Sequence, residues 1–269
     1  MEIKHVSFAY GKNLVIRDMS FQIPDHKITT LMGANGCGKS TMFSLMTKNL
    51  RPGRGAIFHK GKNIQDVKLK DFARQVAIVH QNNSSSGDIT VEELVAFGRT
   101  PYRRMGKRET DEDREKISWA MEAANVTQYK DKAMSTLSGG QKQRVWIAMA
   151  LAQDTEMLLL DEPTTYLDIR YQIEILDLIR DLNERFHLTV VMVLHDINQA
   201  VAYSDEVIGM KDGKVFFQGE PETVITRENM KEIYGIDMDV EEVHGQRYVL
   251  TCAGKYRPHT KDKEADEGR

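Results

Sequence analysis

The sequence predicts an α/β fold, with a core built around a largely parallel sheet, a small antiparallel β-subdomain at the N-terminus and a helical subdomain inserted into the core. Three observations predict it. Short β-rich runs alternate with helical patterns in both halves of the chain, a glycine-rich loop joins one such run to a helix, and a charged helical stretch separates the two halves. Strands that alternate with helices are typical of parallel sheets, because a helix is the usual crossover between two parallel strands.

The N-terminal half is expected to begin with a β-hairpin. Ile3, Val6 and Phe8 mark the first strand, and a turn at residues 11–13 leads into a second strand over residues 15–23. The other elements expected in this half are a strand over residues 28–32, a helix over residues 41–48, and strands over residues 56–58 and 76–79.

A helical subdomain is expected over about residues 83–154. Its pattern is charged and helical, and Ile117, Met121 and Ala124 recur there at helical spacing. The core then resumes with elements of alternating type. These are a strand over residues 157–160, a helix over residues 173–186, a strand over residues 189–194, and a hairpin over residues 207–217 that turns at Asp212-Gly213.

The domain organisation follows from these elements. We expect one main domain over residues 1–220, whose core consists of residues 1–82 and 155–220. A small C-terminal extension is expected over residues 221–254, and the polar, charged residues 255–269 are expected to be disordered. The sequence shows no internal repeat, so a single domain of this kind is expected.

Composition excludes several classes of protein. The 269 residues are 41% hydrophobic and 29% charged, as expected for a soluble globular protein. The 37 basic and 40 acidic residues argue against a non-specific nucleic-acid binder. Two cysteines, Cys37 and Cys252, are too few for a disulfide framework and favour a reduced, intracellular setting. We expect no signal peptide, and no apolar run has the length needed to span a bilayer.

Residues 33–40 follow the P-loop pattern of a glycine, four residues, Gly-Lys and then Ser or Thr. In such a loop, glycines turn backbone N–H groups towards phosphates, and the following helix adds its positive end. Lys39 is expected to neutralise the β- and γ-phosphates of ATP, and the Ser40 hydroxyl to hold Mg²⁺. The residues expected to contact the nucleotide here are Gly33, Ala34, Asn35, Gly36, Cys37, Gly38, Lys39, Ser40 and Thr41.

Cys37 lies inside this loop. A small filler residue explains it better than a redox role, and alkylation of Cys37 is expected to block nucleotide binding.

Two carboxylates follow the apolar strand expected over residues 157–160. Ligands of open α/β sheets bind at the carboxyl ends of the strands. Asp161 is placed there to hold Mg²⁺ through water, and Glu162 to act as the general base for an attacking water. A solvated acidic turn is the alternative interpretation, and the P-loop makes it the weaker one.

A Leu-Ser-Gly-Gly-Gln pentapeptide at residues 137–141 precedes a helix expected over residues 142–153. Small residues before a helix leave backbone N–H groups free to bind an anion. From spacing alone, an ordinary Ser-Gly helix start is favoured over an anion-binding site.

This pentapeptide resembles the signature motif of the ABC (ATP-binding cassette) family, and the other family motifs follow in order over about residues 1–220. Tyr10 resembles the aromatic residue that stacks on adenine, and Gln81 the Q-loop glutamine that touches Mg²⁺. Residues 165–168 resemble the D-loop, which ends at Asp168, and His195 resembles the switch histidine that contacts the γ-phosphate.

The resemblance implies the fold of an ABC-type P-loop NTPase with a RecA-like core, and a mechanism in which two cassettes face each other head to tail. Each ATP, with its Mg²⁺, then lies between the P-loop of one chain and the signature motif of a second copy of the chain. The signature residues expected to contact it are Ser138, Gly139, Gly140 and Gln141. Catalysis is assigned to Glu162, His195 and Gln81.

Residues 98–102, 164–168 and 195–200 are similar to the importer ATPases for iron–siderophore complexes, haem and cobalamin. We expect an ATPase that powers ferric-siderophore import, peripheral on the cytoplasmic face of the cell membrane. It would bind transmembrane permease subunits, serve a substrate-binding protein indirectly and bind no nucleic acid.

Three alternatives stay open. They are an importer ATPase for haem, cobalamin or a metal ion; a soluble ABC protein acting on ribosomes or DNA; and a regulatory binder that does not hydrolyse ATP. The basic residues Arg99, Arg103, Arg104, Lys107 and Arg108 form either a solvated face or part of a docking site for the permease.

Overall fold

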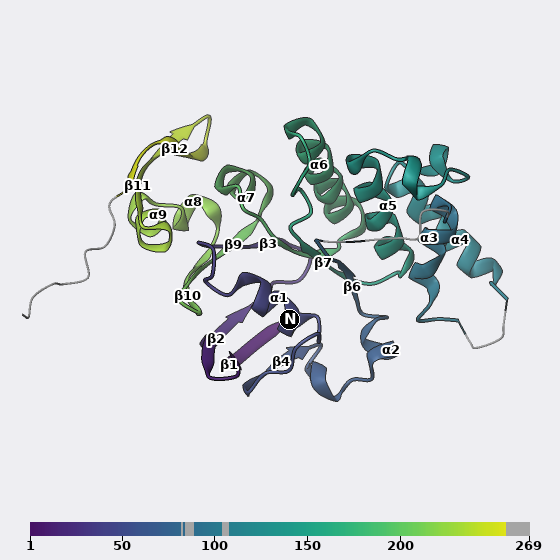
Figure 1. Ribbon diagram of the computed structural model, residues 1–269, viewed down its shortest axis with the longest axis horizontal. Helices are drawn as coiled ribbons and strands as arrows, with labels where there is room; N and C mark the ends of the chain where they lie inside the picture. Colours follow the sequence, from purple (N-terminus) through teal and green to yellow (C-terminus); the bar gives the residue numbers. More distant parts are fainter. Residues whose placement is uncertain (82, 84–88, 104–107, 257–269) are drawn as a thin grey trace, which may run out of the picture.

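The computed structural model describes residues 1–81, 83, 89–103 and 108–256, with the backbone alone for residues 252–256. A six-stranded sheet crosses the middle of the molecule. An antiparallel sheet and helix α1 (Lys39–Met46) lie on one side of it, and helices α6 (Ile169–Phe186) and α7 (Ile197–Tyr203) lie on the other (Figure 1). The helical subdomain and the C-terminal residues lie at opposite ends of the molecule (Figure 1).

The central sheet has the strand order β10-β9-β3-β8-β7-β6. Five of its strands pair in parallel, and β10 is an antiparallel edge strand. Their bounds are β3 Ile28–Met32, β6 Val76–Val79, β7 Met157–Asp161, β8 Thr189–Val193, β9 Glu206–Lys211 and β10 Lys214–Gly219. Strands β3 and β8 are buried along their whole length, as expected for parallel strands covered on both faces.

Alternation along these strands separates two apolar clusters. In β7, Met157 and Leu159 pack in the cluster of α1 and the antiparallel sheet, whereas Leu158 and Leu160 pack in the cluster of the helical subdomain. Successive side chains of a strand point to opposite faces, so one apolar run supplies both cores.

The antiparallel sheet has the order β2-β1-β4-β5. Its strands are β1 Glu2–Tyr10, β2 Asn13–Gln22, β4 Arg54–His59 and β5 Lys62–Asn63, and two short helices follow it, η1 Ile64–Asp66 and α2 Leu69–Phe72. Its buried face contributes Ile3, Val6 and Ile57 to the cluster around α1. The expected N-terminal antiparallel subdomain is therefore present.

The expected helical subdomain is also present. It consists of α3 Val91–Ala96, η2 Phe97–Arg99, α4 Asp111–Ala123, η3 Thr127–Tyr129, η4 Met134–Thr136 and α5 Gly139–Ala152. Thr90 and Thr110 begin α3 and α4 with capping boxes, in which the threonine hydroxyl and the carboxylate three residues later each bind the other residue's backbone N–H. Together with the P-loop core, this subdomain confirms the predicted fold class.

Three helices begin earlier than expected, and two of them, α5 and α6, begin at a side-chain cap. Helix α1 begins at Lys39 and ends at Met46, not at residues 41 and 48. Helices α5 and α6 begin directly after the capping residues Ser138 and Asp168, three and four residues before their expected starts. Apolar spacing does not reveal a first turn that lies outside the apolar core, and at α5 and α6 the cap decides the boundary.

The C-terminal unit, residues 221–256, folds back onto the core (Figure 1). It comprises α8 Pro221–Val224, α9 Arg227–Tyr234, β11 Ile236–Val243 and β12 Gln246–Tyr256. Strand β12 includes residues 255 and 256, for which the expectation of disorder was therefore wrong, because both pair with the start of β11. The rest of the expected tail, residues 257–269, lies outside the described residues.

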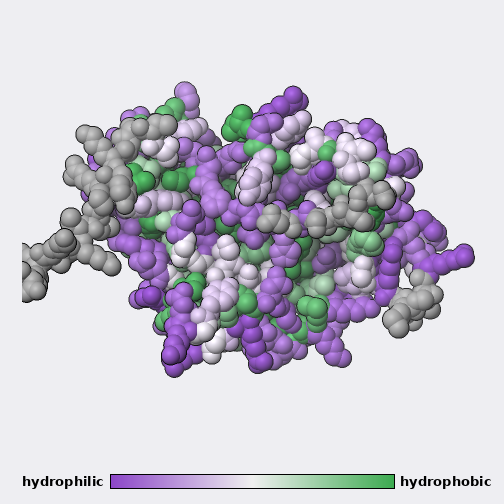
Figure 2. Space-filling view, viewed as in Figure 1, coloured by the Kyte–Doolittle hydropathy of each residue, from purple (hydrophilic) through white to green (hydrophobic). Residues whose placement is uncertain are grey.

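The surface agrees with the high content of charged residues. On the face shown in Figure 2, hydrophobic residues occupy small areas between hydrophilic ones. Within the described ranges, the search for a helix with the length and apolarity to cross a bilayer finds none.

Candidate active site

The P-loop connects β3 to α1 and has the conformation that its glycines allow. Gly33, Gly36 and Gly38 all have positive φ, with 144° at Gly33. A Cβ at Gly33 would lie 2.3 Å from the carbonyl oxygen of Met210 in the neighbouring strand β9. Only glycine fits this position, because it combines a left-handed backbone with close contact to another chain segment.

Lys39, the first residue of α1, is folded over the loop. Its ammonium group donates hydrogen bonds to the carbonyl oxygens of Gly33, at 2.7 Å, and Ala34, at 3.2 Å. The side chain is buried, so its charge lies at the wall of a cavity of about 310 Å³. The cavity is lined by Val15, Asn35, Gly36, Gly38, Lys39, Ser40, Thr41, Glu162 and His195.

Glu162 is the point on which the predicted catalytic residues converge. Its carboxylate accepts a hydrogen bond from Gln81 Nε2 at 2.5 Å, and His195 Nε2 lies 2.5 Å from its other oxygen. The Thr165 hydroxyl donates to it at 3.0 Å. Gln81, Glu162 and His195 come from the ends of β6, β7 and β8, and parallel strands bring those ends to one edge of the sheet. The structure therefore brings together the three residues predicted to be catalytic.

Thr165 is a contact that the sequence did not predict. It lies three residues after Glu162, in a turn where Glu162 has a φ of 50°. A left-handed backbone is uncommon for a residue other than glycine, and such strain concentrates at functional sites. A Thr three residues after a strand-end carboxylate is the only local signal of this contact, and that signal is weak.

Asp161 is less exposed than a carboxylate usually is. Burial and, to a smaller extent, the adjacent Glu162 charge raise the pKa of Asp161 to about 6, and His195 opposes the shift. Its Oδ1 atom is buried and has no hydrogen-bond partner among the described residues. A buried oxygen of this kind, together with the Ser40 hydroxyl and the Gln81 amide, fits the preference of Mg²⁺ for oxygen ligands.

The signature residues lie elsewhere. Ser138 caps α5 through a capping box with Gln141, in which the Ser138 N–H donates to the Gln141 side chain at 3.0 Å. Gln141 also donates to the Tyr129 hydroxyl at 3.1 Å, so its side chain is held within its own subdomain. Of the described residues, those that line the P-loop cavity include none from 138–141. One chain therefore does not unite the two predicted nucleotide-contacting segments.

Two other predicted nucleotide contacts also lie outside the cavity lining, as far as the described residues show. Asp168 caps α6 by accepting the Tyr171 N–H at 3.2 Å. Tyr10 lies at the end of β1 with an exposed ring, edge-on to Phe8 at 4.9 Å between ring centroids. Tyr166, the second residue of the predicted D-loop, is 87% exposed. These exposed groups have the accessibility that contact with a nucleotide or a second chain requires.

The basic segment of the helical subdomain corrects part of the sequence interpretation. Arg99 is 1% exposed and belongs neither to a solvated face nor to a docking surface. Its guanidinium donates to Asp113 at 2.8 Å and to the Ala152 carbonyl at 3.0 Å, and stacks on the Tyr102 ring at 4.0 Å. These partners compensate the burial of its charge. Arg103 pairs with Glu109, Arg108 is exposed, and Arg104 and Lys107 lie outside the described residues.

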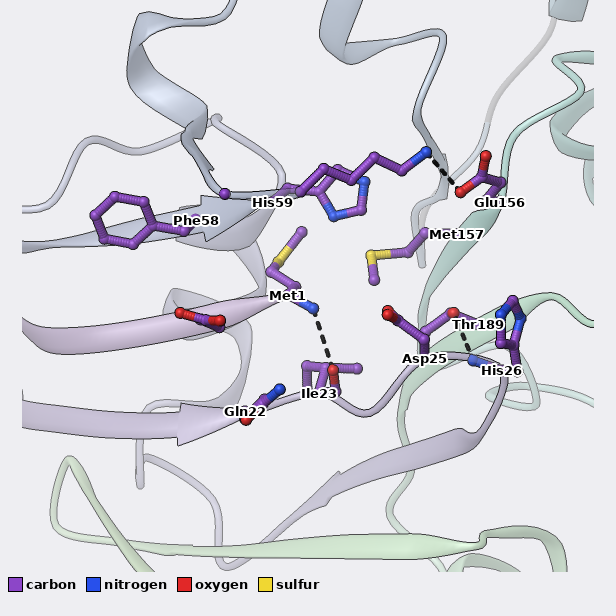
Figure 3. Close-up of a pocket in the computed structure, with 13 residues that line it drawn as sticks. Met1, Gln22, Ile23, Asp25, His26, Phe58, His59, Glu156, Met157 and Thr189 are labelled. Atoms are coloured by element: carbon purple, nitrogen blue, oxygen red, sulfur yellow. Dashed lines mark hydrogen bonds and ion pairs between the residues drawn. The ribbon is translucent and has the colours of Figure 1, made fainter.

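A second polar cavity, of about 190 Å³, lies at the opposite end of the central sheet, beside the starts of β7 and β8 (Figure 3). His59 is 6% exposed there, and neither ring nitrogen has a hydrogen-bond partner among the described residues. Burial lowers the pKa of His59. The N-terminal amine donates to the Ile23 carbonyl at 3.1 Å, and Lys60 pairs with Glu156 at 2.6 Å. These residues are separate from the P-loop cavity.

Comparison with known proteins agrees with this geometry. The family model described as "ABC transporter" matches residues 16–165. This match spans the P-loop, Gln81, the signature motif and the two carboxylates at the end of β7. The chain therefore belongs to the ABC transporter family and is an ATP-binding, ATP-hydrolysing cassette.

Individual relatives cover almost the whole chain. It is 43% identical to the iron(3+)-hydroxamate import ATP-binding protein FhuC of Bacillus subtilis (strain 168), over 89% of both chains. It is 42% identical to the ferric enterobactin transport ATP-binding protein FepC of Escherichia coli (strain K12), over 96% of this chain and 95% of FepC. Among solved structures, it resembles the dimeric, post-hydrolysis cassette MJ0796 bound to ADP and Pi, with a TM-score of 0.70, 28% identity, and coverage of 82% of this chain and 98% of that one.

Proposed function

We propose that this cassette powers the import of ferric siderophores and that Glu162 is the general base of its ATP hydrolysis. One observation carries the catalytic assignment. The Glu162 carboxylate lies in the wall of the cavity that Lys39 and Ser40 line, and three side chains hold it in place. A carboxylate held at the edge of a phosphate site can accept a proton from water as that water attacks the γ-phosphate.

Each side chain of the site has a role in this mechanism. The P-loop N–H groups and Lys39 bind the phosphates and offset the charge that develops on the transferred group. Gln81, Thr165 and His195 orient the Glu162 carboxylate, and the half-exposed His195 ring can also turn to the γ-phosphate. Positioning supplies much of the catalysis, because phosphoryl transfer requires an attacking water aligned with the bond that breaks.

Mg²⁺ is proposed to bind at Ser40, Gln81 and Asp161. These residues offer a hydroxyl, an amide and a buried carboxylate oxygen. When bound, the ion would offset the negative charge of the nucleotide phosphates. No three His, Cys, Asp or Glu side chains among the described residues form a metal-binding group. This agrees with a Mg²⁺ ion held by few protein ligands together with the nucleotide.

We further propose that two copies of the chain bind ATP between them. Support comes from the separation of the signature residues from the P-loop cavity within one chain, and from the dimeric state of the MJ0796 cassette. Tyr10, Ser138, Gly139, Gly140, Gln141 and Asp168 are then the residues that complete the site. The backbone N–H groups at the start of α5 suit the γ-phosphate of the partner's ATP.

The cargo is proposed from the relatives, which are named for the import of ferric hydroxamates and ferric enterobactin. The cassette would bind a transmembrane permease at the cytoplasmic face of the cell membrane, with a substrate-binding protein on the other side. Growth of a deletion strain on single defined iron sources tests the cargo. We expect the strain to stop growing when a ferric siderophore is its only iron source. The assignment would be overturned if growth on siderophores were unchanged and growth were instead lost with haem as the iron source or in the absence of cobalamin.

Glu162→Gln tests the catalytic assignment, with Glu156→Gln as a matched control at the other end of β7. Loss of a general base typically lowers turnover by about 10²- to 10⁴-fold. We expect this loss for Glu162→Gln with ATP binding retained, and near-normal turnover for Glu156→Gln, because Glu156 pairs with Lys60 far from the P-loop. Equal turnover in Glu162→Gln and the parent would refute the assigned base.

A further inference from the structure

The C-terminal unit packs against the two segments that frame the active site. Met32, the last residue of β3, directly precedes Gly33, and Ile197 begins α7 two residues after His195. Both pack in one apolar cluster with the C-terminal unit. The buried members of this cluster are Met32, Ile197, Val201, Val207, Ile225, Met230, Ile233, Met238 and Val249. The unit therefore contacts the start of the P-loop and the helix behind His195.

Tyr234 forms the direct link to the P-loop. It is the last residue of α9, it packs against the apolar cluster that contains Met32, and its phenol oxygen faces the backbone N–H of Gly33. Cys37 and Asp196 are close enough to act on its titration. Burial holds the pKa of Tyr234 far above its usual range, so the phenol stays neutral at physiological pH. A partly buried, neutral hydroxyl thus lies beside the P-loop.

The bonds around Gly33 continue to the catalytic lysine. The N–H of Gly33 faces the Tyr234 hydroxyl, and its carbonyl accepts the hydrogen bond from Lys39 Nζ at 2.7 Å. Gly33 also has a φ of 144° and lies so close to the Met210 carbonyl of β9 that no Cβ would fit between them. A change at Tyr234 is therefore transmitted to the position of the Lys39 ammonium group.

Asn198 forms the second link. Its side-chain amide accepts the Val249 N–H at 2.8 Å and donates to the Val249 carbonyl at 3.1 Å. Both backbone groups of one β12 residue are thus bound by a side chain of α7. Asp196 caps the same helix by accepting the Gln199 N–H at 2.8 Å, and it directly follows His195. Movement of β12 would therefore shift the helix that follows the switch histidine.

We propose that the C-terminal unit positions the active site, with Tyr234 holding the P-loop through Gly33 and Asn198 holding the helix that follows His195. This inference rests on the proposed ATPase function and assigns a role to residues 221–256. Tyr234 and Asn198 are positioning residues, because they act through Gly33 and α7. If the unit had a purely structural role, substitutions in it would lower the stability of the fold without changing the affinity for nucleotide.

Tyr234→Phe removes only the hydroxyl group and is compared with Tyr248→Phe in the same unit. The Tyr248 hydroxyl bonds only a side chain of its own hairpin, Gln246, at 3.3 Å in the described structure. The measurement is equilibrium binding of a fluorescent, non-hydrolysable ATP analogue to the full-length chain, with thermal unfolding measured in parallel. We expect the dissociation constant to rise about fivefold for Tyr234→Phe, the effect of losing a polar contact worth about 1 kcal/mol, and to stay unchanged for Tyr248→Phe.

Two results would overturn the P-loop link. One is an unchanged dissociation constant for Tyr234→Phe, whether or not its unfolding temperature falls. The other is an equal rise for Tyr248→Phe. If the parent chain neither binds nor hydrolyses ATP, the proposed function fails instead, so the two failures are distinguishable.

The link through Asn198 is tested by Asn198→Asp, which keeps the acceptor for the Val249 N–H and loses the donor to its carbonyl. The control is Asn229→Asp, because the Asn229 amide donates to the Val224 carbonyl at 2.8 Å within the unit itself. We expect kcat to fall severalfold for Asn198→Asp while the ATP dissociation constant is unchanged, since His195 acts on bound nucleotide. Unchanged kcat, or the same loss in Asn229→Asp, would overturn this link.

Discussion

The two ends of strands β7 and β8 make an informative comparison. Each end has a cavity, ionisable groups with shifted pKa values and a buried polar atom without a hydrogen-bond partner among the described residues. At the carboxyl end the unpartnered atom is Asp161 Oδ1. At the amino end both ring nitrogens of His59 are unpartnered. Burial of an ionisable group therefore does not distinguish the two ends.

Convergence of side chains does distinguish them. At the carboxyl end, side chains from three separate parts of the chain converge on the Glu162 carboxylate. At the amino end, Lys60 and Glu156 form a half-exposed pair, and the His59 ring has no such partners among the described residues (Figure 3). Ligands of parallel sheets bind at the carboxyl ends of the strands, and of these two ends it is the carboxyl end where the described residues that hold a reacting group gather. The predictions below test this difference, from the largest effect to the smallest.

Substitution of a histidine at each end of β8 gives the largest contrast. His195→Asn removes the group that contacts Glu162, and we expect ATP turnover to fall by about 10²-fold. His187→Asn is the matched control, because His187 precedes the same strand and its left-handed backbone, with a φ of 53°, is one that asparagine tolerates. Steady-state ATPase assays measure both. Similar turnover in the two variants would contradict the proposal that the catalytic residues gather at the carboxyl end of the strands.

Asp161→Asn separates function from stability at the carboxyl end. The raised pKa of Asp161 shows that its charge is disfavoured in the folded chain, so a neutral side chain of the same shape is expected to stabilise the fold. We expect the unfolding temperature without nucleotide or Mg²⁺ to rise by about 2–4 °C, equivalent to ~1 kcal/mol, while ATPase activity is lost. A lowered unfolding temperature would contradict this account, and differential scanning calorimetry measures it.

His59 predicts a pH dependence for the amino end. Its pKa is lowered first by burial and then by the N-terminal amine and Lys60, and Asp25 and Glu156 oppose this shift. Below the unfolded pKa of about 6.5, the unfolded chain binds the proton more readily than the folded chain does. The stability from neutral His59 is therefore complete above about pH 6.5 and is lost as pH falls towards the folded pKa.

The measurement compares the parent with His59→Phe from pH 7.5 to pH 5.5. Relative to this variant, the parent should lose up to ~1 kcal/mol of unfolding free energy over that range. ATPase activity at pH 7.5 should be nearly equal in the two proteins, because the His59 cavity does not include the P-loop residues described here. A difference in stability that does not change with pH would remove His59 as the cause.

Cys37 gives the smallest effect, on a reaction rate. The thiol is 6% exposed, and burial raises the pKa of Cys37, which lowers the fraction of reactive thiolate at neutral pH. In a Cys252→Ser background, we expect alkylation at least about tenfold slower than for a free thiol, slower still with ATP, and faster as pH rises. The fully alkylated chain should no longer bind ATP. Full affinity for ATP after complete alkylation would refute the prediction that Cys37 lies against the nucleotide.

Predictions from the sequence were accurate where neighbouring residues determine the structure, and they failed where contacts between residues distant in the sequence decide it. Strands β3 and β6 have the predicted bounds, because a short apolar run between polar turns has few alternatives. Helix α6 was predicted four residues too short, because its first turn lies outside the buried core and its start depends on the Asp168 cap. Arg99 was placed with other basic residues, although its burial depends on Asp113 and on the Ala152 carbonyl, which no local pattern reveals.

By itself, the sequence determined the chemistry of this protein: a phosphate-binding loop, two carboxylates after a buried strand, and a capped helix with small residues at its start. These features depend on neighbouring residues and on backbone geometry, so they can be recognised in a linear sequence. Only the tertiary structure decided which groups meet. It brought Gln81, Thr165 and His195 to Glu162 and put Tyr234 against Gly33. Such contacts depend on how distant strands and helices pack, and packing is a property of the whole fold.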